Sequence, residues 1–176
     1  RDRILFRRGE RQRILGRSAD AEASFRRLAL EQPESPLRHQ AILKRALIVL
    51  DMGMEEAAAG LLAELARDNP DPDIHAAALY HAGEAHALLG NPQKAVEHYE
   101  TLRRQFPQSD LAPYSRLRQA ALLGDDEKAE AQTQALALYQ SLIDNPPNDR
   151  LGAEALFQAA SLTFNRGEHA AAFTRF

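Results

Sequence analysis

The fold is decided by residues 79–107, which read LYHAGEAHALLGNPQKAVEHYETLRRQFP. Apolar and small residues recur there at helical spacing, and Gly90 then permits the left-handed backbone that often follows a helix end. Asn91-Pro92 predicts a tight turn, with the proline in the first turn of a second helix. Pro107 prevents that second helix from continuing. The stretch therefore predicts a hairpin of two helices.

The same pattern recurs twice toward the N-terminus, each time with a step of 37 residues. The aligned positions hold residues that a helical hairpin needs: glycine after the first helix, proline after the second, small residues where the helices approach, and large apolar residues that fill the gap to the next hairpin. The columns are Gly16, Gly53 and Gly90; Pro33, Pro70 and Pro107; Ala21, Ala58 and Ala95; Phe25, Leu62 and Tyr99; Leu28, Leu65 and Leu102; Leu5, Ile42 and Leu79; Gly9, Ala46 and Gly83. So many columns in one register indicate an internal repeat.

A fourth copy follows with about six additional residues near 125–130, and a fifth copy begins near Ala153. The additional residues lengthen either the turn or the second helix; we favour the helix, because Ala, Glu and Gln predominate and neither Gly nor Pro occurs. We expect an all-α fold, a right-handed superhelical solenoid of about four and a half antiparallel hairpins. The expected repeats span about 2–35, 39–72, 76–109, 110–148 and 153–176.

The two ends of the sequence suggest a piece of a longer chain. It opens in the charged segment Arg1-Asp2-Arg3 and stops at Phe176, inside the second helix of the fifth copy. Each hairpin of a solenoid buries its apolar face only against a neighbour. We therefore expect dimerisation or crystal contacts to cover the open fifth hairpin.

Charge is distributed unevenly along the chain. The net charge is −3, yet residues 1–27 carry nine arginines against four acids, and the remainder is acidic. The basic first hairpin either meets an acidic partner, a membrane surface or a neighbouring domain, or is simply a solvated helix face. No apolar run approaches the ~20 residues of a membrane span. The overall charge does not favour a nucleic-acid partner.

Residues that could carry chemistry do not form a recognisable site. The chain lacks cysteine, a Gly-rich phosphate loop, a His-Glu-x-x-His motif and a nucleophile elbow around its serines. His81 and His86 lie five residues apart, on different helix faces, and His86 occupies a core column. The acidic run 125–130 lacks the spacing of a calcium loop and reads as a solvated helix start. We expect no catalytic residues, no cofactor and no bound metal, and hence no enzyme.

The columns resemble those of the tetratricopeptide repeat. That family has a large apolar residue, then Leu or Ala, Gly or Ala, and Tyr on its first helix. Its second helix has Ala, then Phe or Tyr, then Ala, and a proline follows. Leu79, Ala82, Gly83, Ala95, Tyr99 and Pro107 match this pattern, as do Leu5, Gly9, Gly16, Ala21, Phe25 and Pro33. The departures are a repeat length of 37 in place of 34, and Gln12, Val49 and His86 where the family places tyrosine.

The linkers between repeats resemble those of one subset of this family. A proline followed by Ser or Asp, as in Phe106-Pro107-Gln108-Ser109-Asp110, is similar to bacterial envelope members such as the TolA-binding periplasmic protein and outer-membrane assembly lipoproteins. Bacterial cytosolic proteins with the same linkers also exist. This resemblance favours a periplasmic or envelope-associated protein over a cytoplasmic one.

Residues on the first helix of each repeat are expected to line the concave face of such a superhelix. The fifth position of each repeat reads Phe6, Leu43, Tyr80, Tyr114 and Phe157, and polar neighbours on the same face include Lys44, His81, Glu84 and Arg118. We expect this aromatic ladder to bind a partner peptide, with aromatics as anchors. The alternative is that these side chains pack on their neighbours within the superhelix.

Two functions follow. The first is a protein–protein interaction scaffold that binds a peptide or partner segment in its concave groove, within a bacterial envelope complex. The second is a regulatory or substrate-presenting arm of a larger enzyme whose catalytic domain lies outside these residues.

Overall fold

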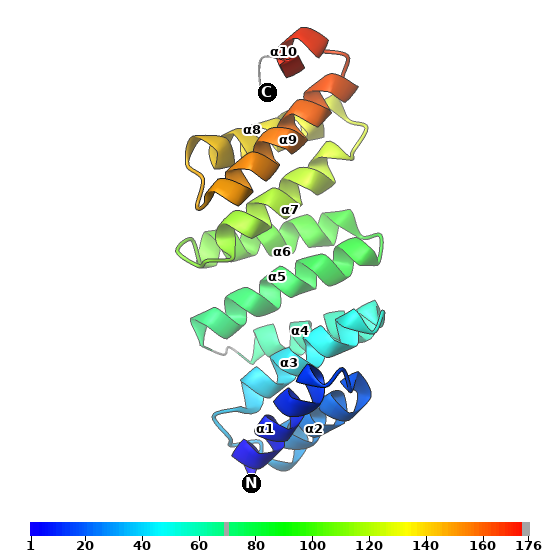
Figure 1. Ribbon diagram of the computed structural model, residues 1–176, viewed down its shortest axis with the longest axis vertical. Helices are drawn as coiled ribbons and strands as arrows, with labels where there is room; N and C mark the ends of the chain where they lie inside the picture. The colour runs from blue at the N-terminus through cyan, green and yellow to red at the C-terminus, as the bar shows by residue number, and fades with distance from the viewer. Residues whose placement is uncertain (69–70, 174–176) are drawn as a thin grey trace. The chain divides into compact units, whose positions relative to one another are not determined.

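The computed structural model describes residues 1–68 and 71–173, and the only regular secondary structure within them is helical (Figure 1). The helices are α1 Asp2–Ile14, α2 Ser18–Glu31, α3 Arg38–Asp51, α4 Glu55–Arg67, α5 Pro72–Leu88, α6 Pro92–Gln105, α7 Ala112–Gly124, α8 Ala129–Asp144, α9 Asp149–Asn165 and α10 His169–Phe173. The predicted all-α fold is confirmed. None of the described helices is long and apolar enough to cross a membrane.

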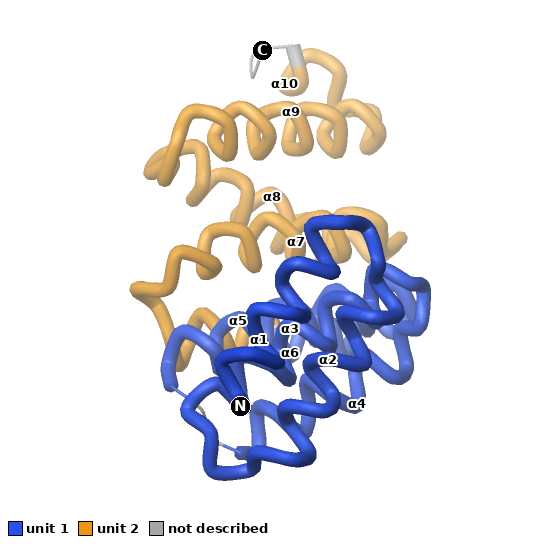
Figure 2. Tube along the Cα trace, turned by 60° about the horizontal axis from the view of Figure 1, so that its bottom comes forward, with its two compact units in different colours: residues 1–98 blue, residues 99–176 orange. Residues whose placement is uncertain are grey.

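The chain divides into two compact units (Figure 2). Unit 1 comprises residues 1–98 and unit 2 residues 99–176, so the division falls within α6. Each unit is built from consecutive antiparallel helices. The expected repeat boundaries, and one solenoid over the whole chain, stay predictions.

A left-handed glycine ends the first helix of each hairpin in unit 1. Gly16, Gly53 and Gly90 have φ values of 71°, 71° and 70°, where a side chain would be strained. At the first turn the Gly16 N–H donates to Arg13 O at 3.0 Å and the Arg17 N–H donates to Gln12 O at 2.9 Å. These two bonds satisfy carbonyls that the helix leaves without partners, so the turn is a Schellman motif. The predicted role of these glycines is confirmed.

The core of unit 1 joins each hairpin to the next helix. One cluster packs residues of α1 and α2 with Ala41 and Ile48 of α3 around the fully buried ring of Phe25. A second cluster packs α3 and α4 with Ala78 and Ala82 of α5. Since each cluster needs a helix from the following hairpin, stability in this unit is shared between neighbouring hairpins.

Unit 2 repeats this arrangement with α7, α8 and α9. Its core includes Leu117, Tyr139 and Leu142, closed by Leu151 and Leu162 of α9. The expected column residues of the fourth copy are therefore buried.

The six additional residues of the fourth hairpin are shared among three elements. α7 continues through Gly124, whereas the earlier first helices end two residues before their glycines. The linker 125–128 is one residue longer than its counterparts, and α8 begins three residues earlier relative to the column residue Ala135. The favoured longer second helix thus accounts for only half of the insertion. Gly124 is helical, and a Cβ there would lie 3.4 Å from Leu162 Cδ2.

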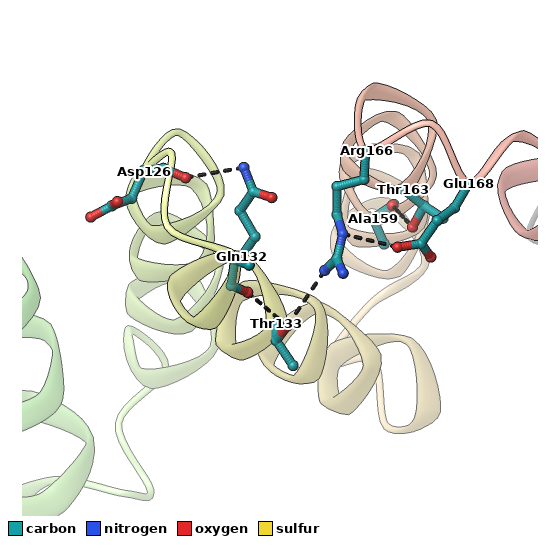
Figure 3. A network of polar contacts seen from close by, with 8 residues as sticks. Asp126, Gln132, Thr133, Ala159, Thr163, Arg166 and Glu168 are labelled. Atoms are coloured by element: carbon teal, nitrogen blue, oxygen red, sulfur yellow. Dashed lines mark hydrogen bonds and ion pairs between the residues drawn. The ribbon is translucent and has the colours of Figure 1, made fainter.

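Hydrogen bonds hold the lengthened helix at both sides (Figure 3). The backbone carbonyl of Asp126 accepts from Gln132 Nε2 at 3.0 Å. Arg166, just after α9, donates from Nη1 to Thr133 Oγ1 at 3.5 Å and pairs through Nε with Glu168 Oε1 at 3.0 Å. The start of α8 is thereby tied to the α7–α8 linker and to the turn that follows α9.

Two residues used in the sequence interpretation, Pro70 and Phe176, lie outside the described residues. The predicted association through the C-terminal hairpin therefore stays a prediction.

Candidate partner-binding surface

The nine residues expected to form the groove lie on the first helix of each hairpin. Phe6 is on α1, Leu43 and Lys44 are on α3, and Tyr80, His81 and Glu84 are on α5, all in unit 1; Tyr114 and Arg118 are on α7 and Phe157 is on α9, in unit 2. The two sets differ in how far their side chains reach solvent.

In unit 1 the apolar members of the column pack internally. The Phe6 ring meets the Phe25 ring edge-on, with ring centroids 5.5 Å apart. Leu43 packs against the cluster formed by α3, α4 and α5. Both side chains are therefore partly buried against the core.

Tyr80 is also largely buried, with 8% of its surface exposed. Its ring lies edge-on to the His81 ring at a centroid distance of 5.1 Å. His81 Nδ1 in turn lies 2.8 Å from Glu84 Oε2, so these two polar residues of the expected groove interact with each other. Tyr80 therefore exposes little surface area to a partner. Its burial gives little support to the prediction of a groove centred on this residue.

Lys44 lies across from α1 in the same unit. Its Nζ is 3.9 Å from Glu10 Oε1, and both side chains are partly exposed. An ion pair of this length at a surface contributes little to stability, roughly 0–1 kcal/mol. Lys44 remains accessible to an acidic group without a large energetic cost.

In unit 2 the same column reaches solvent. Tyr114 is 41% exposed and Phe157 is 56% exposed. They occupy equivalent positions on α7 and α9, which pack against each other. Arg118, one turn beyond Tyr114, is exposed as well. Two aromatics and an arginine thus share one accessible face.

A groove of about 550 Å³ adjoins Tyr114 where the linkers meet. Pro107 and Pro113 line it from one side and Pro147 and Asn148 from another. The three prolines contribute apolar surface to the groove, and its polar lining includes Ser109, Asp110 and Asn148. The groove is large enough for a small ligand or for a few side chains of a peptide.

Two histidine rings of unit 1 stack on each other. The sequence drew attention to His86 but not to His98. The rings of His86 on α5 and His98 on α6 lie parallel within 7°, with centroids 5.3 Å apart. Burial, and then the positive charge of Lys94, lowers the pKa of His86. Burial, followed by His86, lowers the pKa of His98. The lowered pKa values favour the neutral rings, and His86 is only partly buried in the column where the sequence predicts a core residue.

A polar cluster in unit 2 was not identified from the sequence. Gln119 of α7 is 3% exposed and lies beside Arg103 of α6 and Arg116 of α7. The available signal was weak: the equivalent positions Ile48 and Ala85 are apolar and buried, but Arg11 in the first copy is charged and exposed. Only the packing of α6, α7 and α8 shows what Gln119 faces.

The part of the chain that the structure describes holds no group of three or more His, Cys, Asp or Glu side chains arranged to hold a metal ion.

The architecture defines a class: all-helical proteins built from repeated antiparallel hairpins. Residues 77–109 match the model of the tetratricopeptide repeat, so the chain contains a tetratricopeptide repeat. No curated relative matches the chain.

Solved structures share this fold at low sequence identity. A crystal structure of MamA superposes with a TM-score of 0.77 at 16% identity, covering 96% of this chain and 90% of that one. A tetratricopeptide repeat protein from Parabacteroides merdae gives a TM-score of 0.63 at 16% identity, with coverages of 99% and 77%. The TPR2AB domain of yeast Sti1, solved as a complex with pHSP90, gives 0.54 at 14% identity, with coverages of 99% and 87%.

Proposed function

We propose that this chain is a protein–protein interaction scaffold and that a peptide or partner segment binds the exposed helix face formed by Tyr114, Arg118 and Phe157. The observation that carries the proposal is the exposure of two aromatic rings at one repeat position on packed helices. The complex of yeast Sti1 with pHSP90 gives one instance of this fold engaging a protein partner.

The exposed rings are suited to act as anchors. Covering the exposed part of an aromatic side chain that buries 150–250 Å² in full yields about 2–3 kcal/mol per ring. Two rings together yield about 4–6 kcal/mol, which reaches only the lower end of the cost of association, roughly 4–15 kcal/mol. The partner segment must therefore also contact the groove beside Tyr114, whose lining includes Asp110 and Asn148.

The chemistry of the surface defines the partner segment. Apolar or aromatic side chains would cover Tyr114 and Phe157, and an acidic side chain would pair with Arg118 at the edge. An extended segment or an amphipathic helix can present such side chains on one face.

The scaffold is proposed to act within a bacterial envelope complex. The support is the Pro-x-Ser/Asp pattern of the linkers, in which the hydroxyl of Ser109 accepts from the Leu111 N–H at 3.2 Å. Fractionation of the source cells, with the intact gene product detected by antibody, tests this part separately. Recovery with the periplasmic or membrane fraction is expected, and recovery only with the cytosol would contradict it.

Comparative capture from native lysate tests the scaffold proposal. The wild-type chain, Tyr114→Ala, Phe157→Ala and Leu30→Ala serve as baits, and the captured proteins are quantified by mass spectrometry. Leu30 is the control, because it is an apolar side chain that is 74% exposed but lies on α2 of unit 1, outside the repeat column. Partners should be retained by Leu30→Ala and lost with the other two variants. An identical set captured by all four baits would contradict the proposal.

A further inference from the structure

A second concave site lies within unit 2, among α6, α7 and α8. It has a volume of about 530 Å³. Its lining includes Glu100, Arg103, Arg116, Gln119, Leu138 and Ser141. Gln134 and Ala137 at its edge are exposed, so the site opens to solvent.

Gln119 forms the buried floor of this site. Its Nε2 donates to Glu100 Oε1 at 2.9 Å. Its Oε1 is buried, and no described residue donates to it. A buried amide oxygen without a donor is destabilising, and a ligand N–H would satisfy it.

Arg103 has a buried donor that lacks an acceptor. Its Nη1 is buried, and no acceptor for it occurs among the described residues. Burial, followed by the repulsion from Arg116, lowers the pKa of Arg103, and Glu100 offsets only part of this effect. Two guanidinium groups with a single carboxylate leave the site with a net positive charge.

We propose that this site binds an aspartate or glutamate residue of a partner peptide, with its carboxylate accepting from Arg103 and Arg116 and a main-chain N–H donating to Gln119 Oε1. A carboxylate accepts paired guanidinium donors well. The single negative charge matches the net charge of the site, whereas a phosphate would place two negative charges beside Glu100. A peptide also supplies the N–H that a free anion lacks.

The proposal does not rest on the exposed aromatic face. Successive residues of a helix turn by about 100°, which places Gln119 about 140° and Leu123 about 180° around α7 from Tyr114. Arg116 lines both this site and the groove beside Tyr114, whereas Arg103 lines this site alone of the two. Substitution of Arg103 therefore leaves the groove residues in place, and either proposal can fail alone.

Titration of the ¹⁵N-labelled chain with capped tripeptides, followed by NMR, tests the assignment. The first peptide has a central aspartate and the second a central asparagine; inorganic phosphate is the third titrant. We expect saturable shifts of the Gln119 side-chain amide with the aspartate peptide, and binding about tenfold weaker or more for asparagine, since a hydrogen bond to a charged group is lost. Absence of saturable shifts, equal affinity for both peptides, or tighter binding of phosphate would each overturn the proposal.

Neighbouring arginines provide a matched control. Arg103→Gln removes the partly buried guanidinium that carries the buried Nη1, whereas Arg104→Gln removes the same charge from an exposed side chain one residue later. The aspartate peptide should lose at least about tenfold in affinity with Arg103→Gln and little with Arg104→Gln. Equal losses would show a general charge effect and contradict the site. Circular dichroism of each variant verifies that the helices are retained.

Discussion

The same repeat position has different surroundings in the two units. In unit 1, Phe6 and Leu43 pack against core clusters and Tyr80 is 8% exposed. In unit 2, Tyr114 and Phe157 are 41% and 56% exposed. A position that faces a groove in the repeat pattern is therefore a core position in one unit and an accessible surface in the other.

The difference arises from what each neighbouring hairpin supplies. In the first hairpin the small residue Gly9 lets the Phe25 ring approach α1, and Phe6 covers that ring. In unit 2 the Tyr139 ring packs in a cluster that does not include Tyr114 or Phe157. The repeat pattern thus predicts the type of residue at this position, whereas local packing determines whether its side chain is buried in the core or exposed to solvent.

The largest contrast should appear in stability. Tyr80→Ala removes a largely buried ring and should lower the free energy of unfolding by about 2–4 kcal/mol. Tyr114→Ala removes an exposed one and should change it by less than about 0.5 kcal/mol. Thermal melts followed by circular dichroism measure both. Equal effects would show that the two rings have the same role.

Glycine substitutions sharpen the comparison at a smaller scale. A Cβ at Gly9 would lie 2.8 Å from Phe25 Cζ, whereas at Gly124 the nearest atom is 3.4 Å away. Gly9→Ala should therefore destabilise the chain by about 1 kcal/mol, the overpacking cost outweighing the gain in helix propensity. Gly124→Ala should stay within about 0.5 kcal/mol of wild type.

Gly60 supplies the reference for these variants. It lies inside α4 with open space around it, so Gly60→Ala should stabilise the chain by about 0.5–1 kcal/mol through helix propensity alone. Urea titration gives all three values. A stabilised Gly9→Ala variant would contradict the tight packing of Phe25 against α1.

A smaller effect concerns pH and unit 1. The pKa of both His86 and His98 lies below 6.5 in the folded state, chiefly because of burial. The unfolded chain therefore binds more protons below about pH 6.5, and stability should fall as the pH is lowered through and below that value. Above it, this contribution is fully present.

Melting temperatures between pH 7.5 and 5 measure this dependence. His86→Gln with His98→Gln should flatten the profile over this range, while His169→Gln, in unit 2, should leave it as in wild type. A double variant with the wild-type profile would assign the dependence to other groups.

The repeat pattern allowed much of the fold to be predicted, because turn glycines and core columns depend on local spacing. The left-handed Gly16 and the buried Leu62 illustrate this. Gly124 was different: nothing in the sequence shows that it stays helical beneath Leu162. Its conformation depends on α9, which lies in the next hairpin.

The candidate surfaces could be predicted only in part for the same reason. The repeat position located Tyr114 and Phe157 but not their exposure, which depends on side chains from other helices. The site at Gln119 needs residues from three helices, with Glu100 on α6 and Ser141 on α8. Such groupings are not visible as spacing along the chain.

Hydrogen exchange of the chain with and without a captured partner tests the central claim most directly. The claim is that the exposed face of unit 2 binds the partner and that the equivalent face of unit 1 does not. Partner-induced protection should appear in α7 and α9, with exchange in α1, α3 and α5 unchanged. Protection in α1, α3 and α5, with α7 and α9 unchanged, would contradict the account.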